Sequence, residues 1–118
     1  MTDSPDRTPD AESHLPLNSR DFQVLLLCFD EPMHGYGIVK AAAESGSSVL
    51  DLGSLYRIIA RLTKDGLLED VSPEVGDSKR QRRFYRATEL GRRVARAEGV
   101  RLRTLLESEQ AELLWERP

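Results

Sequence analysis

The first stretch with a regular hydrophobic pattern is LNSRDFQVLLLCFDEP, residues 17–32. Asn18 followed three residues later by Asp21 resembles a capping box, so a helix is expected to begin there and to end before Pro32. Its interior, VLLLCF, is apolar almost all round. Because a helix on the surface keeps a polar face, this one is expected to be buried on two sides, within the domain or against a second subunit.

A second helix is expected between Tyr36 and Ser45, where the chain is rich in alanine, with Gly46 as its stop. Gly35 and Gly37 flank Tyr36 in the first turn. Since glycine lowers helix stability, two glycines here indicate that another part of the chain, or a ligand, approaches the backbone closely.

The third predicted helix lies in DLGSLYRIIARLTKDGLL, with Asp51 as its N-cap and Gly66 as its stop. At about 100° per residue, one face of this helix is apolar. The residues of this apolar stripe are Leu55, Ile58, Ile59 and Leu62. The opposite face combines two cations with two small residues, namely Gly53, Arg57, Ala60 and Lys64. Such a face fits a helix that enters a groove.

Beyond Gly66 the spacing of hydrophobic residues changes from the period of a helix to that of a strand. The segments LLEDV and RRFYRA have strand composition, and the polar, basic segment PEVGDSKRQ between them predicts a hairpin with a long tip. Thr88 is a candidate N-cap for one long helix from Glu89 towards Trp115, with Gly99 as a place where it can bend.

Charge is distributed unevenly over these segments. The chain of 118 residues has a formal net charge of -3, but most of its lysines and arginines lie between Arg57 and Arg103. Residues 1–16 are acidic and contain three prolines and few apolar side chains, which predicts a disordered arm. A basic middle between acidic ends attracts a polyanion at short range, while the ends limit indiscriminate adhesion.

The expected order is helix, helix, turn, helix, and then a two-stranded hairpin with a basic tip. This is the order of a winged helix-turn-helix, a mainly α fold with a small β-hairpin (α+β), in which the third helix enters the major groove and the wing follows the DNA backbone. We expect a disordered acidic arm over residues 1–16, the DNA-binding winged helix-turn-helix over residues 17–88 and a C-terminal dimerisation helix over residues 89–118.

Four stretches resemble the PadR-like transcriptional regulators: the apolar first helix, EPMHGYGIVK, GSLYRIIARLTKDGLLE and RRFYRATELGRR. The second is similar to the family's Pro-x-His-Gly-Tyr-Gly segment, the third to its recognition helix, and the fourth to its wing strand and Tyr-x-x-Thr-x-x-Gly exit. The similarity covers about residues 17–96, and it departs from the family at Arg57 and Ala87, where proline and leucine are common. The short C-terminus resembles the small subclass, which has one long terminal helix.

This resemblance implies a homodimeric repressor in which the terminal helix packs against the first helix of the partner. The residues support a dimer independently, because the apolar first helix and the leucines of the terminal helix offer more apolar surface than so small a monomer can cover. Two recognition helices would then lie about one DNA turn apart, roughly 34 Å, on an inverted-repeat operator.

The third helix supplies the first group of candidate DNA-binding residues. Arg57 and Lys64 are expected to contact bases in the major groove, with arginine suited to a bidentate contact with guanine. Ser54, Tyr56 and Arg61 on the flanks are expected to contact phosphates through hydroxyl or guanidinium groups. For Tyr56, half-buried packing remains an equal alternative.

The wing supplies the second group. These residues are expected to neutralise phosphates, which makes binding dependent on salt, and they are Lys79, Arg80, Arg82 and Arg83. Tyr36, at the start of the second helix, is a further candidate for a phosphate contact, with packing of its ring as the alternative.

The sequence offers little for other chemistry. His34 and the lone Cys28 lack further ligands at metal-ligand spacing, so neither a metal nor another cofactor is expected. Trp115 is either a packing anchor or a ring that stacks on an effector in a dimer-interface cavity, as the resemblance implies for some relatives. No phosphate-binding loop, nucleophile elbow or suitably partnered carboxylate pair points to an enzyme. The single cysteine and the lack of any apolar run of membrane-spanning length predict a cytoplasmic protein without a membrane partner.

Two functions fit this sequence. The first is a sequence-specific DNA-binding transcriptional regulator, a homodimeric repressor released by a small-molecule effector or another signal. The second is a protein-interaction module on a winged-helix scaffold that no longer binds an operator, an alternative that the acidic termini and Arg57 keep open.

Overall fold

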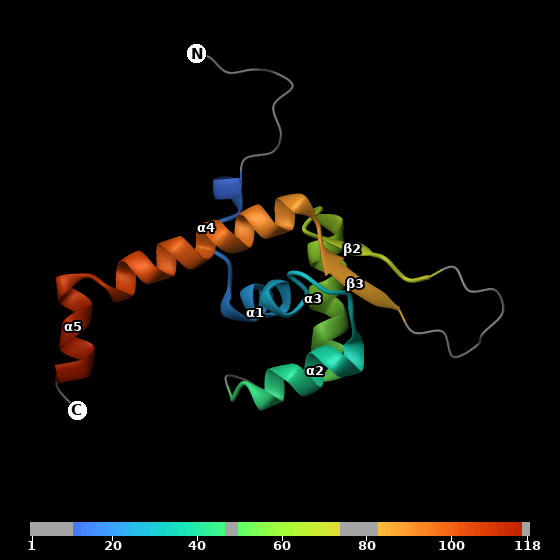
Figure 1. The fold of residues 1–118 in the computed structure, drawn as a ribbon, viewed down its shortest axis with the longest axis horizontal. Coiled ribbons are helices and arrows are strands. Elements are labelled where there is room, and N and C mark those ends of the chain that lie inside the picture. Colours follow the sequence, from blue (N-terminus) through green and yellow to red (C-terminus); the bar gives the residue numbers. More distant parts are fainter. Residues whose placement is uncertain (1–10, 47–49, 74–82, 117–118) are drawn as a thin grey trace, which may run out of the picture.

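The computed structural model describes residues 11–46, 50–73 and 83–116. Its elements are η1 (a 3-10 helix, Ala11–His14), α1 (Ser19–Leu27), β1 (Met33–His34), α2 (Gly35–Glu44), α3 (Leu52–Lys64), β2 (Leu68–Asp70), β3 (Phe84–Ala87), α4 (Glu89–Leu106) and α5 (Glu109–Glu116). Figure 1 shows α1, α2 and α3 grouped beside the small sheet, while α4 crosses the group and extends beyond it to α5. The expected mainly α fold with a small antiparallel sheet is confirmed.

Side-chain caps start the first three α-helices. Asn18 and Asp51 accept hydrogen bonds from the backbone N–H three residues further on, as their sequence positions predict. His34 does the same for α2, with Nδ1 lying 3.1 Å from the backbone nitrogen of Gly37. Histidine is an uncommon cap, so the sequence pattern alone did not reveal this role.

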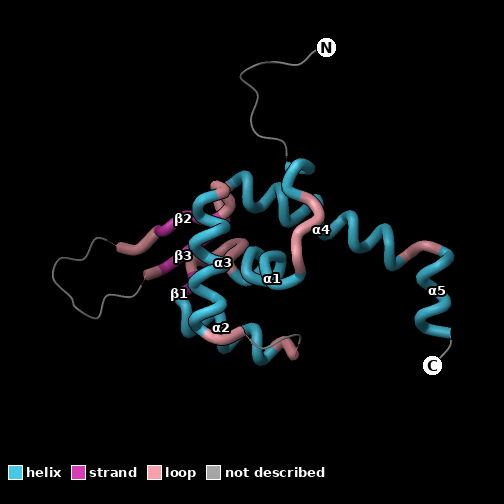
Figure 2. The backbone as a smooth tube through the Cα atoms, turned by 180° about the vertical axis from the view of Figure 1, so that it is seen from behind, coloured by secondary structure: helices cyan, strands magenta, loops and turns pink. Residues whose placement is uncertain are grey.

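The sheet contains three strands, so the prediction of a two-stranded hairpin is incomplete. The strands lie in the order β1-β3-β2 (Figure 2). Both pairs are antiparallel, with Met33 opposite Tyr85 and Leu68 opposite Ala87. The ring of His34 also lies edge-on to that of Phe84, with 5.4 Å between centroids. A strand of two residues is too short to show an alternation of hydrophobic and polar residues. It is recognised as a strand only because it pairs with a distant segment.

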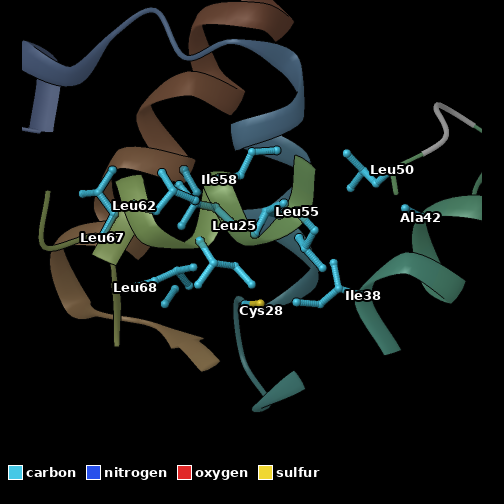
Figure 3. Packing of buried hydrophobic residues seen from close by; sticks show 14 of the residues in the cluster. Leu25, Cys28, Ile38, Ala42, Leu50, Leu55, Ile58, Leu62, Leu67 and Leu68 are labelled. Atoms are coloured by element: carbon cyan, nitrogen blue, oxygen red, sulfur yellow. The ribbon is translucent and has the colours of Figure 1, made fainter. Parts of the chain in front are cut away.

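The hydrophobic core lies between the helices and the sheet. The apolar stripe predicted for α3 is confirmed, because Leu55, Ile58, Ile59 and Leu62 are all buried. Figure 3 shows three of these leucine and isoleucine side chains gathered with Leu25 of α1, while Ile38 of α2 and the sulfur of Cys28 lie close by. The polar face of α3 is thereby turned away from the core, towards solvent.

The turn after the wing is fixed by Thr88. Its hydroxyl donates to the carbonyl of Gly66 at 2.6 Å and accepts from the backbone N–H of Gly91 at 2.9 Å, while its own N–H donates to the carbonyl of Leu67. A Cβ on Gly91 would lie 2.0 Å from the carbonyl oxygen of Leu67, so only glycine permits this approach. These contacts tie the end of α3, the sheet and the start of α4 into one unit.

Residues 11–16 correct the expectation of a disordered arm over residues 1–16, whose first ten residues lie outside the described part of the chain. Residues Ala11–His14 form η1, which lies against α4 (Figure 1). Leu15 and Leu17 pack against the core, and the N–H of Leu17 donates to Oε1 of Glu98 at 3.4 Å. The few apolar residues of this segment pack against a surface that forms only when the chain is folded.

The C-terminal region corrects a second expectation, because it forms two helices instead of one. Helix α4 runs through Gly99 and ends at Leu106, and α5 begins at Glu109. Between them the hydroxyl of Ser108 donates to the carbonyl of Leu105 at 2.8 Å and accepts from the N–H of Ala111 at 3.2 Å. A serine side chain that bonds to nearby backbone competes with the helix, which explains the break at this position.

Candidate nucleic-acid interface

The outward face of α3 has the composition that its sequence predicts. Gly53, Arg57, Ala60 and Lys64 are all exposed, opposite the buried stripe. Two of these residues carry positive charge and two are too small to keep another surface away. A helix with such a face can approach the floor of a groove in a polyanion.

The two flanks of α3 face different helices. On the flank towards α2, the hydroxyl of Tyr56 lies beside the backbone of Gly35, where an added Cβ would be 2.6 Å from the oxygen. This approach accounts for the glycine at the start of α2. Tyr56 nevertheless remains 48% exposed, so it both packs and faces solvent.

On the flank towards α1, Arg61 forms an ion pair with Asp21. One guanidinium nitrogen of Arg61 lies 2.5 Å from a carboxylate oxygen of Asp21, whose side chain is only 9% exposed, while the Arg61 side chain is 49% exposed. The capping-box pattern predicted that the carboxylate of Asp21 would interact with the start of α1. In the structure it pairs with Arg61 of α3 instead. This pairing joins residues 40 positions apart, so the local sequence pattern contains no sign of it.

Arg57 lies in the second turn of α3. Its guanidinium donates to the hydroxyl of Ser54 at 3.3 Å, and that hydroxyl in turn donates to Asp51. The pKa of Asp51 is lowered, first by the backbone hydrogen bond from Ser54 and further by the hydroxyl of Ser54 and the charge of Arg57. The arginine is thus held on the solvent side of the helix without being buried.

The base of the wing is organised by a small polar cluster. Asp70 accepts hydrogen bonds from the hydroxyl and the N–H of Ser72 and pairs with Arg83 at 3.1 Å. These contacts, with the Ser72 hydroxyl as the largest cause, hold the pKa of Asp70 below its ordinary range. Ser72 also accepts from the N–H of Phe84, which links the two wing strands. The other predicted wing cations, Lys79, Arg80 and Arg82, lie outside the described residues.

Tyr36 and Trp115 are exposed. Tyr36 in the first turn of α2 is 67% exposed, and Trp115 on α5 is 71% exposed. Within one chain, neither ring packs into the core. Helix α5 contains no buried residue, so an anchoring role for Trp115 requires a second molecule.

Cys28 and His34 have structural surroundings. Burial raises the pKa of the Cys28 thiol to about 12, so the thiol stays protonated at neutral pH. His34 caps α2 and packs against Phe84. Among the described residues, no three His, Cys, Asp or Glu side chains are grouped so that they could hold a metal ion. None of the described helices is long and apolar enough to cross a membrane.

Comparison with known proteins places these features in a family. Residues 24–97 match the transcriptional regulator PadR-like family, which is most of the chain. The chain belongs to this family. The match includes the C-terminal part of α1, all of α2 and α3, both wing strands and the first half of α4, so the resemblance expected from the sequence motifs is confirmed. Among curated proteins, none is significantly similar in sequence to this PadR-like protein.

Solved structures share its winged-helix fold. A PadR family transcriptional regulator from Eggerthella lenta DSM 2243 is 28% identical, with a TM-score of 0.67 over 92% of this chain and 87% of that chain. A PadR family regulator from Clostridium difficile R20291 is 20% identical, with a TM-score of 0.68 over 79% of this chain and 96% of the other. Bacillus subtilis PadR in complex with operator DNA is 18% identical, with a TM-score of 0.59 over 66% of this chain but only 46% of its own.

Proposed function

We propose that this PadR-like protein is a sequence-specific DNA-binding transcriptional regulator that acts in the cytoplasm as a homodimeric repressor on an inverted-repeat operator. The observation that carries the proposal is the outward face of α3, where cations and small residues stand beside a β-hairpin wing. The family membership and the operator complex of Bacillus subtilis PadR, which shares the fold, support it.

In this proposal α3 reads the bases. Arg57 and Lys64 contact base edges in the major groove, and Arg57 is suited to the two acceptors of guanine. Ser54, Tyr56 and Arg61 bind phosphates on either side of the groove, as does Tyr36 from the start of α2. Arg83 and the predicted wing cations, Lys79, Arg80 and Arg82, add phosphate contacts that give affinity but carry no base information.

The dimer in this proposal covers apolar surface that one chain leaves open. The large exposed apolar side chains of α4 and α5 are Val100, Leu105, Leu106, Leu113, Leu114 and Trp115. Leu26 on α1 is also 50% exposed, in line with contact between the terminal helices of one subunit and the first helix of its partner. Burial of these side chains against a second subunit favours association. Trp115 at this interface is the residue that we assign to stacking on an effector which releases the repressor.

The proposal is tested by footprinting and gel-shift titration of the DNA upstream of the protein's own gene. We expect a protected region with two half-sites centred about one helical turn apart, roughly 34 Å. Binding should fall steeply with salt, by about 0.9 logarithmic units per phosphate contacted. If neither this DNA nor duplexes selected from a random pool are bound at micromolar protein, the alternative of a protein-interaction module on a winged-helix scaffold is favoured.

A further inference from the structure

A pocket lies between the start of α1 and the adjoining flank of α3. It has a volume of about 360 Å³. Its lining residues are Asn18, Ser19, Arg20, Asp21, Ser54, Arg57, Ile58 and Arg61. The helix that we assign to base reading and the first helix of the domain therefore share one polar cavity.

The charge of this pocket is positive. Three arginines line it, and its one carboxylate, Asp21, is already paired with Arg61. Ser19 and Ser54 add hydroxyl groups. Because a guanidinium offers five N–H donors in a planar fork, pairing with Asp21 leaves donors of Arg61 free for another acceptor. A cavity with these groups favours an oxyanion.

Arg61 is held in place before any ligand binds. Its contact with the largely buried Asp21 restrains a side chain that would otherwise lose much freedom on binding. Arg20 is exposed on the opposite wall, which belongs to α1. An anion between the two walls would accept hydrogen bonds from two different helices at once.

We propose that this pocket seats one backbone phosphate of the bound duplex, with Arg20 and Arg61 as its main donors. Ser54, Arg57 and Arg61 follow one another along the same side of α3, so the pocket continues directly into the face assigned to the major groove. A DNA strand bordering that groove passes over it. Helix α1 then becomes a third DNA-contacting element beside α3 and the wing. This inference rests on the proposed function.

The first test compares Arg20→Ala with Arg103→Ala, each removing one exposed arginine, the second one from the distant part of α4. The probe is a labelled duplex selected from a random pool by the wild-type protein, with dimerisation of each variant checked by sedimentation. We expect Arg20→Ala to bind roughly tenfold more weakly and to lower the salt slope by about 1.8, since one phosphate contact is lost in each half-site, while Arg103→Ala binds like the wild type. Equal affinity of the two variants would overturn the inference. Failure of the wild type to select any duplex would overturn the proposed function instead.

A second test locates the phosphate. Single phosphates of the selected duplex are replaced by uncharged methylphosphonates, and binding of wild-type protein and Arg20→Ala is compared at each position. We expect one position per half-site at which the wild type loses affinity and the variant does not. Loss of the same size in both proteins at every position would contradict the pocket's role.

Two further measurements use an Arg61 variant and competition by a free anion. Arg61→Lys retains a charge beside Asp21 but loses the fork, so we expect it to show the same methylphosphonate insensitivity as Arg20→Ala. Inorganic phosphate, added at constant ionic strength, should displace the duplex no better than chloride does. Strong displacement of the wild type, but not of Arg20→Ala, would identify a site for a free anion and would overturn the assignment to the DNA backbone.

Discussion

Gly91 and Gly99 lie eight residues apart in α4 and have opposite surroundings. A Cβ on Gly91 would lie 2.0 Å from the carbonyl oxygen of Leu67, whereas nothing lies within 4 Å of a Cβ on Gly99. The first glycine lets the wing exit pass close to the end of α3. The second sits in the helix without a steric reason, where glycine costs backbone entropy.

Substitution by alanine should therefore have opposite effects at the two sites. We expect Gly91→Ala to destabilise the protein by about 1 to 3 kcal/mol, because the backbone of Leu67 has to shift. Gly99→Ala should stabilise it by about 0.5 to 1 kcal/mol. Chemical denaturation at one fixed protein concentration measures both. Similar losses at both sites would mean that close packing at Gly91 is not the cause.

Arg57 is the residue that we expect to contribute most to base recognition. Arg57→Ala should weaken the complex with a selected operator by about 1 to 3 kcal/mol and leave binding to unrelated DNA nearly unchanged, because a base contact is lost. Competitive titration with both duplexes makes the comparison. An equal loss on both would assign Arg57 to the phosphate backbone, together with the pocket formed by α1 and α3.

At the scale of elements, helix α4 holds the N-terminal segment through a buried carboxylate. Glu98 is 2% exposed and accepts hydrogen bonds from Arg101 at 2.7 and 2.9 Å and from the N–H of Leu17. The hydrogen bonds from Arg101, followed by that from Leu17, lower the pKa of Glu98. The charged form of Glu98 is therefore the one that stabilises the fold.

This shift sets a direction for the dependence of stability on pH. A carboxyl whose pKa is lower in the folded than in the unfolded state contributes stability above the unfolded pKa, about 4.3, and loses that contribution as the pH falls towards the folded value. We expect Glu98→Gln to remove this part of the acid sensitivity. Urea denaturation between neutral and acidic pH is the measurement, with Glu112→Gln on the exposed surface of α5 as the control. If Glu98→Gln and wild type lose stability in parallel on acidification, Glu98 does not contribute in this way.

At the scale of the whole molecule, the terminal helices extend from the winged-helix domain (Figure 1). They carry large apolar side chains that are exposed. Leu106 of α4 and Leu26 of α1 are each about half exposed. In a symmetric dimer every interface residue is used twice, so one substitution changes two contact sites. The proposed dimer is thus sensitive to single charges placed on this surface.

We expect Leu26→Glu and Leu106→Glu each to weaken the dimer roughly a hundredfold, since burial of two leucines is lost and two charges are placed in the interface. Sedimentation at micromolar concentration should show monomers, and operator binding should fall with the dimer. Ala43→Glu adds the same charge to the exposed part of α2 and serves as the control. Dimers of unchanged stability in both leucine variants would show that the subunits associate elsewhere, if at all.

Local patterns in the sequence were sufficient for much of this protein. The caps at Asn18, Asp51 and Thr88 and the buried and outward faces of α3 depend on residues within one or two turns, so they could be inferred without a structure. The wing strands followed from composition and spacing. The outward half of the candidate site, including Arg57 and Lys64, was predictable for the same reason.

Contacts between distant residues were decided only by the tertiary structure. The strand at Met33 exists because β3 pairs with it, and the segment at residues 11–16 is ordered because α4 offers it a surface. Asp21 looked like part of a helix cap, but its carboxylate pairs with Arg61, and this same approach of α1 to α3 brings Arg20 into one pocket with the recognition helix. Hydrophobic period and capping chemistry act over a few residues, whereas the choice of partner for a charge or a strand edge depends on which surfaces the folded chain brings together.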